Sequence, residues 1–311
     1  MSPRSANPPR IAVVIPCLDE ERTIGKVVAD LKAAVPGAEI LVFDNASTDR
    51  TAEIAQAGGA TVVPSPRRGK GNVIRHMAEV VVADVYVLLD GDDTYPASQL
   101  PLLLERFFAD DVDMLVATRL DSHDEHAFRV FHEIGNRVIA RTIALLFRTD
   151  VTDVLSGYRI LSSRFVRLVN LSAEGFEVET EMTLQALAKG LKIVEHPIEY
   201  SARPPGSHSK LDTVSDGLLI FRSIFLLFKD YKPFVFFTSV AALLMTASLL
   251  AGSAPVIDFY RYQFVYHVPR AILAAGLGLL AAVSFGVGLL LDTISRYHRE
   301  TIEQWKRSMR E

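Results

Sequence analysis

The stretch Val85-Tyr-Val-Leu-Leu-Asp90-Gly-Asp92-Asp93 decides the fold and indicates where the site lies. An apolar run typical of a buried strand ends abruptly at carboxylates that one glycine interrupts. In an open α/β sheet, ligands bind just outside the carboxyl ends of the strands. Carboxylates gathered there need a cation, because like charges repel and are costly to bury. Hard oxygen ligands suit Mg²⁺ or Mn²⁺, so the stretch predicts a metal and phosphate site. The alternative is an Asp-rich turn that faces solvent.

Apolar runs alternate with helical patterns along the first two thirds of the chain. Strands are predicted at 11–15, 40–43, 61–63, 85–89 and 114–117, and helices after the first three strands and at 134–147. Strands that alternate with helices form right-handed βαβ units, so the pattern predicts an α/β fold with a mostly parallel sheet. Polar clusters follow several of these strands, and we expect them to converge on one crevice.

Composition and missing motifs disfavour several classes of protein. The chain carries 33 Lys and Arg against 37 Asp and Glu, a balance that does not suggest a nucleic-acid binder. It has no dinucleotide-binding glycine turn, P-loop, nucleophile elbow or zinc-spaced His/Cys cluster. The single cysteine, Cys17, excludes an internal disulfide and fits a reducing compartment. Residues 1–10 lack the apolar core of a signal peptide, so we expect a disordered N-terminus and a cytoplasmic first domain.

Two charge-free runs, 234–254 and 271–291, are each long enough to cross a bilayer, which takes about 20 helical residues. We expect transmembrane helices at 234–257 and 271–291, an external loop at 258–270 and a cytoplasmic tail at 292–311. The alternative is a buried helical hairpin in a soluble protein. Basic residues concentrate before the first run and after the second. The positive-inside rule therefore predicts an integral inner or plasma membrane protein with both termini in the cytoplasm.

The segment 215–233 is apolar with scattered basic residues and ends at Pro233. It predicts a juxtamembrane amphipathic helix that lies in the plane of the membrane interface. Its alternative is an ordinary core helix of the first domain. In either case the segment joins the first domain closely to the first apolar run.

Five ordered motifs resemble the signature series of family 2 glycosyltransferases. They are Ile15-Pro-Cys-Leu-Asp-Glu-Glu21, Asp44-Asn-Ala-Ser-Thr-Asp49, Arg68-Gly-Lys-Gly-Asn72, Asp90-Gly-Asp-Asp-Thr94 and Ser156-Gly-Tyr-Arg159. The series is most similar to the polyprenyl-phosphate glycosyltransferases, the group of bactoprenol glucosyltransferase and dolichol-phosphate mannose synthase. The resemblance implies a GT-A catalytic domain at 11–214 in a membrane-anchored, inverting enzyme, with a homo-tetramer as the implied assembly. Such an enzyme moves a sugar from a nucleotide-diphosphate sugar, UDP-glucose-like or GDP-mannose, to polyprenyl phosphate.

The resemblance assigns roles to residues at the strand ends. Nucleotide contact is implied for Pro16, Leu18, Glu20, Asp44, Lys70 and Gly71. Structural alternatives stay open, because Asp44 is also suited to starting a turn and the basic residues around Lys70 to forming a solvated loop. The glycines on either side of Lys70 permit a close backbone approach, which favours contact with phosphate or nucleotide.

Asp90 and Asp92 are implied as the D-x-D pair that ties the diphosphate to a divalent metal, Mg²⁺ or Mn²⁺. Two positions depart from the family pattern. Asp19 stands where the family often has Asn, and Thr94 stands where the mannose synthases carry Gln. The second departure leaves the third metal ligand open.

A lipid phosphate is already ionised, so its attack on a sugar needs no general base. The site must instead offset the repulsion between two anionic substrates, and Arg119, after the fifth predicted strand, is a candidate for this catalytic role. Acceptor-phosphate contact is assigned to Arg203, Ser209, Lys210 and Arg129. The alternative for the stretch at 203–210 is a basic flank attracted to anionic lipid headgroups.

The donor sugar is assigned to a pocket of five residues, Asp153, Ser156, Gly157, Tyr158 and Glu179. Tyr158 is suited to stacking on the sugar, or else it is a core tyrosine. Glu177, Glu179 and Glu181 recur at every second position, which predicts one face of a strand or an extended turn. The sequence leaves open which of the three faces the donor.

Two rival functions are weaker. A processive polysaccharide synthase is disfavoured, because the sequence has no Gln-x-x-Arg-Trp motif and two spans are too few for a polymer channel. A non-catalytic nucleotide-binding partner of a lipid-carrier pathway is disfavoured by the intact Asp90 and Asp92.

Overall fold

The computed structural model describes residues 8–119, 149–175, 177–199 and 232–308, with single residues between 141 and 147 and between 225 and 229. The chain forms two compact units, Met1–Ile224 and Phe225–Glu311. The predicted helices at 134–147 and 215–233 fall largely outside the described residues.

The first unit is built on a seven-stranded sheet with the order β3-β2-β1-β4-β6-β5-β7. Its strands are β1 (Ile11–Cys17), β2 (Glu39–Asp44), β3 (Thr61–Pro64), β4 (Val85–Leu88), β5 (Met114–Arg119), β6 (Arg159–Ser162) and β7 (Ile193–Ile198). Neighbouring strands are parallel except at β6, which runs antiparallel to β4 and to β5. The predicted α/β fold with a mostly parallel sheet is confirmed, and all five predicted strands are present. The sequence pattern does not predict β6 and β7.

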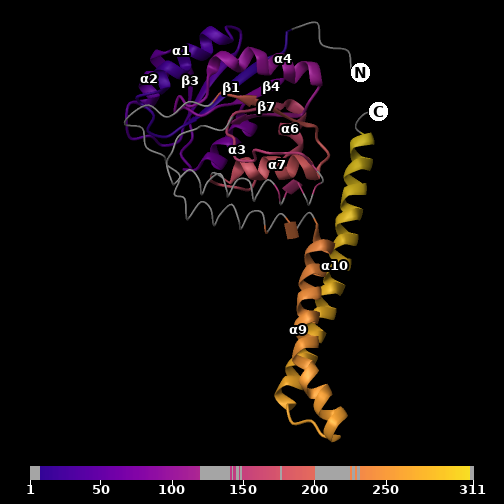
Figure 1. Ribbon diagram of the computed structural model, residues 1–311. Coiled ribbons are helices and arrows are strands. Elements are labelled where there is room, and N and C mark those ends of the chain that lie inside the picture. Colours follow the sequence, from indigo (N-terminus) through magenta and orange to yellow (C-terminus); the bar gives the residue numbers. More distant parts are fainter. Residues whose placement is uncertain are drawn as a thin grey trace. The chain divides into compact units, whose positions relative to one another are not determined.

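Helices cover both faces of the sheet (Figure 1). They are α1 (Ile24–Ala34), α2 (Thr51–Ala57), α3 (Lys70–Val80), α4 (Leu100–Asp110), α6 (Ser163–Leu168) and α7 (Val178–Ala188), with a short 3-10 turn, η1, at Ala97–Gln99. Helices α1, α2 and α4 pack on one face, and α3, α6 and α7 pack on the other (Figure 1). Strand β1 is apolar throughout for this reason, since Val13 and Ile15 face one core while Ala12 and Val14 face the other.

The strand directions gather the functional loops at one edge of the sheet. Strands β1 to β4 are parallel, so the loops after their carboxyl ends lie at the same edge. The reversed strand β6 begins at this edge, because its first residue, Arg159, pairs with Leu88 at the end of β4. The loop before β6, at 153–158, therefore meets the loop after β4, at 89–95. This is the edge at which open α/β sheets bind their ligands.

The prediction of an extended segment at the three acidic residues is wrong. Glu177 directly precedes α7, and Glu179 and Glu181 lie in its first turn. A helix turns about 100° per residue, so residues two apart point in nearly opposite directions. The positive end of the helix dipole favours acidic residues in a first turn, and this preference outweighs the apparent alternation.

The second unit is a hairpin of two long helices, α9 (Pro233–Tyr262) and α10 (Val268–Ser308), which lie side by side (Figure 1). Each contains a 30-residue stretch that is long and apolar enough to cross a membrane. Only 6% and 11% of their most apolar windows are buried, whereas the core helix of a soluble protein is mostly buried. The helices run past the two charge-free runs, and the connection between them is 263–267. The unit is therefore a candidate membrane hairpin.

Candidate active site

The loop after β4 carries the D-x-D pair, and neighbouring groups hold it in place. The hydroxyl of Thr23, next to α1, donates a buried hydrogen bond to the carbonyl oxygen of Gly91 at 2.7 Å. A Cβ at position 91 would lie 2.6 Å from the sulfur of Cys17, so only glycine fits without a shift. Asp92 is buried, and its Oδ1 accepts hydrogen bonds from the Thr94 hydroxyl at 2.6 Å and backbone N–H at 3.2 Å. The loop is thus fixed by the protein itself.

A buried lysine lies between two carboxylates at this loop, and we name the group the Lys70–Asp90–Glu179 cluster. Lys70 is the first residue of α3, and its ammonium forms ion pairs with Asp90 and, at 2.7 Å, with Glu179. Burial lowers the pKa of Lys70, but the two carboxylates outweigh burial and raise this pKa well above its usual range. Burial has the opposite effect on Glu179: it raises the pKa of this carboxyl, and the positive charge of Lys70 offsets the rise only in part. Lys70 is therefore a fixed positive charge beside the first carboxylate of the D-x-D pair.

Gly157, from the loop before β6, lies directly against the cluster. A Cβ at this position would lie 2.6 Å from Oδ2 of Asp90 and 2.7 Å from Nζ of Lys70. The Gly157 backbone N–H donates to the hydroxyl of Tyr95 at 3.0 Å, which holds the glycine in place. The structure therefore brings together four predicted site residues from four separate segments: Lys70, Asp90, Gly157 and Glu179.

Only one of the three predicted glutamates faces the cluster. Glu181 accepts hydrogen bonds from the backbone N–H groups of Ser172 and Ala173, and Glu177 accepts from those of the turn before α7. Glu179 Oε1 pairs with Lys70, while its buried Oε2 has no hydrogen-bond partner among the described residues. Buried polar atoms are normally satisfied, so this oxygen offers an acceptor position within the site.

The predicted nucleotide residues lie at neighbouring strand ends. Asp44, the last residue of β2, pairs in register with Cys17, the last residue of β1. Pro16, Leu18, Glu20 and Asp44 are all partly exposed, as a binding surface requires. The Oδ1 of Asp44 also accepts a hydrogen bond from the backbone N–H of Ser47 at 3.3 Å, so the turn-starting role is present as well.

Asn45 organises the next loop, and the sequence pattern does not single it out. Its buried amide donates to the carbonyl oxygens of Ser65 and Arg67 at 2.9 and 2.7 Å, and its Oδ1 accepts from the N–H of Gly69 at 2.7 Å. One side chain thus fixes the loop that delivers Lys70. An Asn that follows a strand directly, before Ser, Thr and Asp, is the signal that was available in the sequence.

The glycines that flank Lys70 allow a close approach within the protein. Gly69 has φ 120°, and a Cβ at Gly69 or at Gly71 would collide with the backbone of residues 173–174. The N–H of Asn72 also donates to the carbonyl oxygen of Glu174 at 3.3 Å. The close approach is therefore to the protein backbone, and the glycines allow α3 to start at Lys70 beside the cluster.

Arg119, the last residue of β5, forms a two-point ion pair with Asp153. Its Nε and Nη2 each donate to the carboxylate at 3.1 Å. Burial raises the pKa of Asp153, but Arg119 more than offsets burial and holds this pKa below its ordinary value. Glu195 of β7 fixes the same loop by accepting from the backbone N–H groups of Thr152 and Asp153 at 2.9 and 3.0 Å. The partly exposed Arg119 side chain is thereby held in one orientation at the end of its strand.

Two residues assigned to the sugar pocket are part of the core. Tyr158 is fully buried and packs edge-on against Tyr95, with ring centroids 5.4 Å apart, which is the core alternative for this tyrosine. The hydroxyl of Ser156 donates to the carbonyl oxygen of Ala117 at 2.6 Å and so ties its loop to β5.

Arg159 is a further residue whose importance the sequence does not reveal. It is fully buried and donates to the carbonyl oxygens of Ser156 and Val154, both at 2.8 Å, and to the hydroxyl of Thr183 at 2.9 Å. A single guanidinium therefore shapes the loop before β6 and links it to α7.

The predicted acceptor residues lie outside the described residues. They are Arg129, Arg203, Ser209 and Lys210.

The D-x-D pair suits a divalent ion by its chemistry. Asp90 and Asp92 supply hard oxygen ligands on either side of one glycine, and Asp92 is oriented by Thr94. Within the described part of the chain, no group of three or more His, Cys, Asp or Glu side chains is placed to hold a metal. A site with one or two carboxylates is typical of Mg²⁺ that keeps waters and binds substrate phosphates. The residues therefore fit a metal that arrives with a diphosphate.

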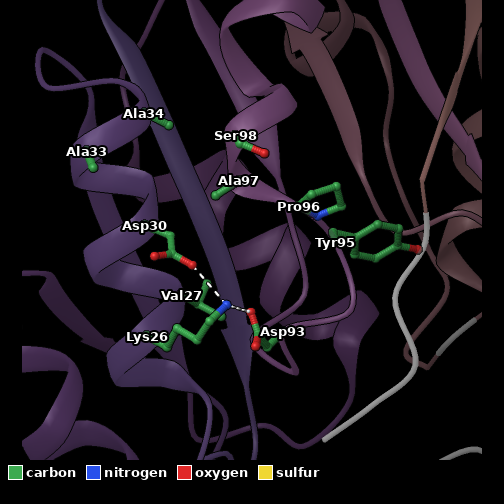
Figure 2. Close-up of a pocket in the computed structure, with 10 residues that line it drawn as sticks. All are labelled: Lys26, Val27, Asp30, Ala33, Ala34, Asp93, Tyr95, Pro96, Ala97 and Ser98. Carbon is green, nitrogen blue, oxygen red and sulfur yellow. Dashed lines mark hydrogen bonds and ion pairs between the residues drawn. The ribbon is translucent and has the colours of Figure 1, made fainter.

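A cavity of about 670 Å³ lies beside the D-x-D loop, between α1 and residues 93–98 (Figure 2). Lys26 lines this cavity and forms ion pairs with Asp30 at 3.0 Å and with Asp93 at 2.7 Å (Figure 2). None of the predicted site residues lines this cavity. Lys26 instead joins α1 to the residue that follows the D-x-D pair.

Comparison with known proteins identifies the family. Residues 12–167 match the family described as Glycosyl transferase family 2. The chain is 32% identical to glycosyltransferase AglJ of Haloferax volcanii, over 96% of this chain and 97% of that protein. It is also 32% identical to a dolichyl-phosphate hexose transferase of the same organism, over 69% of this chain and 92% of that protein. The chain therefore belongs to glycosyl transferase family 2, and it is a glycosyltransferase.

A solved structure supports the GT-A fold. The glucosyl-3-phosphoglycerate synthase of Mycobacterium tuberculosis, in complex with Mn²⁺, UDP and glucosyl-3-phosphoglycerate, superposes with a TM-score of 0.56. It is 25% identical, and the alignment covers 71% of this chain and 79% of that chain. The first unit thus has the architecture of nucleotide-sugar transferases.

Proposed function

We propose that this glycosyltransferase moves a hexose from a nucleotide-diphosphate sugar to polyprenyl phosphate. The observation that carries the proposal is that one chain combines a D-x-D site at the carboxyl edge of the sheet with a hairpin of two exposed apolar helices. Similarity to a dolichyl-phosphate hexose transferase supports the lipid-phosphate acceptor, and the fold shared with a Mn²⁺- and UDP-binding enzyme supports the donor class.

The donor binds along the strand ends in this proposal. The nucleoside lies against Pro16, Leu18, Glu20 and Asp44, and its diphosphate reaches the D-x-D loop. Asp90 and Asp92 would hold a divalent ion that, when bound, neutralises charge developing on the departing diphosphate. The sugar lies against Gly157 and beside Glu179 in this proposal.

The reaction is a single displacement that requires no proton transfer. An oxygen of the lipid phosphate forms a bond to the anomeric carbon while the bond from that carbon to the diphosphate oxygen breaks. The electron pair leaves with the nucleoside diphosphate, and the configuration of the sugar is inverted. Arg119, held in place by Asp153, offsets the repulsion between the two anionic groups.

The acceptor reaches the site from the membrane in this proposal. The two apolar helices anchor the chain in this proposal, and the basic residues that flank the hairpin support a topology with both termini in the cytoplasm. The acceptor phosphate is bound by Arg203, Ser209, Lys210 and Arg129 in this proposal, because cationic side chains form charge-assisted hydrogen bonds with phosphate oxygens.

The test is a transfer assay with the full chain in detergent. Polyprenyl phosphate, Mg²⁺ or Mn²⁺ and a panel of labelled UDP- and GDP-sugars are supplied, and label is followed into the lipid phase. We expect label from one donor class, and we expect it to disappear with EDTA or when polyprenol without phosphate replaces the acceptor. The test variant is Asp92→Asn, which keeps a side-chain oxygen able to accept the hydrogen bond from Thr94 but loses the negative charge of the carboxylate. Label transfer to polyprenol, or full activity of that variant, would contradict the proposal.

A further inference from the structure

The ammonium of Lys70 already occupies a cation position on the D-x-D pair. It is buried and ion-paired with Asp90, the carboxylate proposed to take part in metal binding. Lys70 also keeps a second partner, Glu179, at 2.7 Å. A divalent ion that approaches Asp90 therefore meets the positive charge of the Lys70 ammonium. Like charges in a partly desolvated site repel strongly.

We propose that Lys70 neutralises Asp90 in the nucleotide-free enzyme, so that a divalent metal binds well only together with a nucleotide diphosphate. This inference rests on the metal site of the proposed function and adds the order in which its ligands bind. A diphosphate brings enough negative charge to offset the repulsion between the metal and the ammonium, whereas the metal alone must displace the ammonium against that repulsion. Lys70 thus determines metal affinity without touching the reacting atoms.

The structure contains a position to which the displaced ammonium moves. Glu179 Oε2 is buried and has no hydrogen-bond partner among the described residues, although its neighbour Oε1 pairs with Lys70. When Lys70 leaves Asp90, its freed N–H group donates to this oxygen. Gly157 lies against the same two groups, because a Cβ at this position would come within 2.7 Å of Asp90 and Lys70. The ammonium therefore has two arrangements, one shared between both carboxylates and one on Glu179 alone.

The experiment measures Mn²⁺ binding to the full chain in detergent by electron paramagnetic resonance of the free ion. Titrations are run without nucleotide and then with UDP and with GDP. We expect weak binding to the nucleotide-free enzyme and clear tightening with one nucleotide. Lys70→Met should tighten binding to the nucleotide-free enzyme by about ten-fold or more, because it removes a positive charge next to the ion. Glu179→Gln should not tighten it, because the ammonium then has Asp90 as its only carboxylate partner.

The matched control is Lys26→Met. This change removes an equal charge that pairs with Asp93, next to the D-x-D pair, but Lys26 is 61% exposed and its charge is screened by solvent. We expect less than about a two-fold change in Mn²⁺ affinity for this variant. Thermal unfolding checks whether each variant folds, and Glu179→Gln keeps the inference testable if Lys70→Met does not fold.

The outcomes separate this inference from the proposed function. If nucleotide-free Lys70→Met binds Mn²⁺ no more tightly than the wild type, while the wild type still binds Mn²⁺ with nucleotide, the role of Lys70 is overturned and the proposed metal site is not. Tighter binding by nucleotide-free Glu179→Gln also overturns that role. No Mn²⁺ binding with either nucleotide overturns the metal site on which both proposals depend.

Discussion

Replacing Gly157 with alanine tests whether the Lys70–Asp90–Glu179 cluster must keep its present geometry. The new Cβ would lie 2.6 Å from Asp90 Oδ2 and 2.7 Å from Lys70 Nζ, whereas ordinary contact begins at 3.4 Å. Both groups must therefore retreat by about 0.7 to 0.8 Å, and a misplacement of about 1 Å in a site costs roughly 100-fold in rate. We expect a loss of sugar transfer of that order.

The same substitution should leave the fold intact. Gly157 does not have positive φ, so alanine adopts its backbone conformation without strain, and the atoms it meets are the ends of side chains. Its N–H still donates to Tyr95. Label transfer and thermal unfolding are measured beside Gly37→Ala, where the added Cβ meets nothing within 4 Å. Transfer by Gly157→Ala within about three-fold of the wild type, which corresponds to less than one kcal/mol, would refute the reasoning.

Three further predictions concern single residues. Arg159→Met should destabilise the first unit by about 3 kcal/mol or more, because it leaves the carbonyl oxygens of Ser156 and Val154 buried without a donor. The free energy of unfolding in denaturant measures this effect, and a change below about 1 kcal/mol would contradict it. Asp153 has a lowered pKa, so its contribution to stability is complete above the ordinary Asp value of about 3.9 and is lost as the pH falls through its lower folded value. The stability difference between the wild type and Asp153→Asn should therefore narrow between pH 7 and pH 3, and a constant difference would exclude the ion pair as its source. Lys210→Ala should raise the concentration of polyprenyl phosphate needed for half-maximal rate more than it raises the concentration of nucleotide sugar needed. A larger increase for the nucleotide sugar would assign Lys210 to the donor side.

Strands and helices that carry strong local patterns could be predicted from the sequence. The run at 85–89 is apolar on both faces because β4 is buried between two helical layers, and the same holds for β1. Such runs, each followed by a polar loop, are enough to predict the α/β fold and the edge at which the site lies. The two charge-free runs predict the helical hairpin, because each is long and apolar enough to cross a bilayer.

Contacts between distant segments could not be predicted in this way. Strand β6 has only four residues, and its first residue is a buried arginine, which reads as polar in any pattern. Its reversed direction depends on pairing with β4, far earlier in the chain. The proximity of Gly157 to Lys70 follows from that reversal, so the cluster emerges only from the tertiary structure. The prediction from the alternating glutamates is wrong because three acidic residues are too few to distinguish the period of a helix from that of a strand.

The two departures from the family pattern change little in the geometry of the site. Asp19 Oδ1 accepts from the Thr48 N–H at 2.6 Å and from its hydroxyl at 3.1 Å, and the carboxamide oxygen of an Asn is able to accept the same bonds. Thr94 is close enough to Asp92 to orient its carboxylate directly. In this chain position 94 therefore acts through that carboxylate. In the proposed site the described residues contribute only the D-x-D pair as metal ligands, so phosphate and water would take the remaining coordination positions among them, and metal affinity should then depend on the nucleotide. The ion pair between Lys70 and Asp90 strengthens this dependence, because the same carboxylate that would bind the metal is neutralised until a diphosphate arrives.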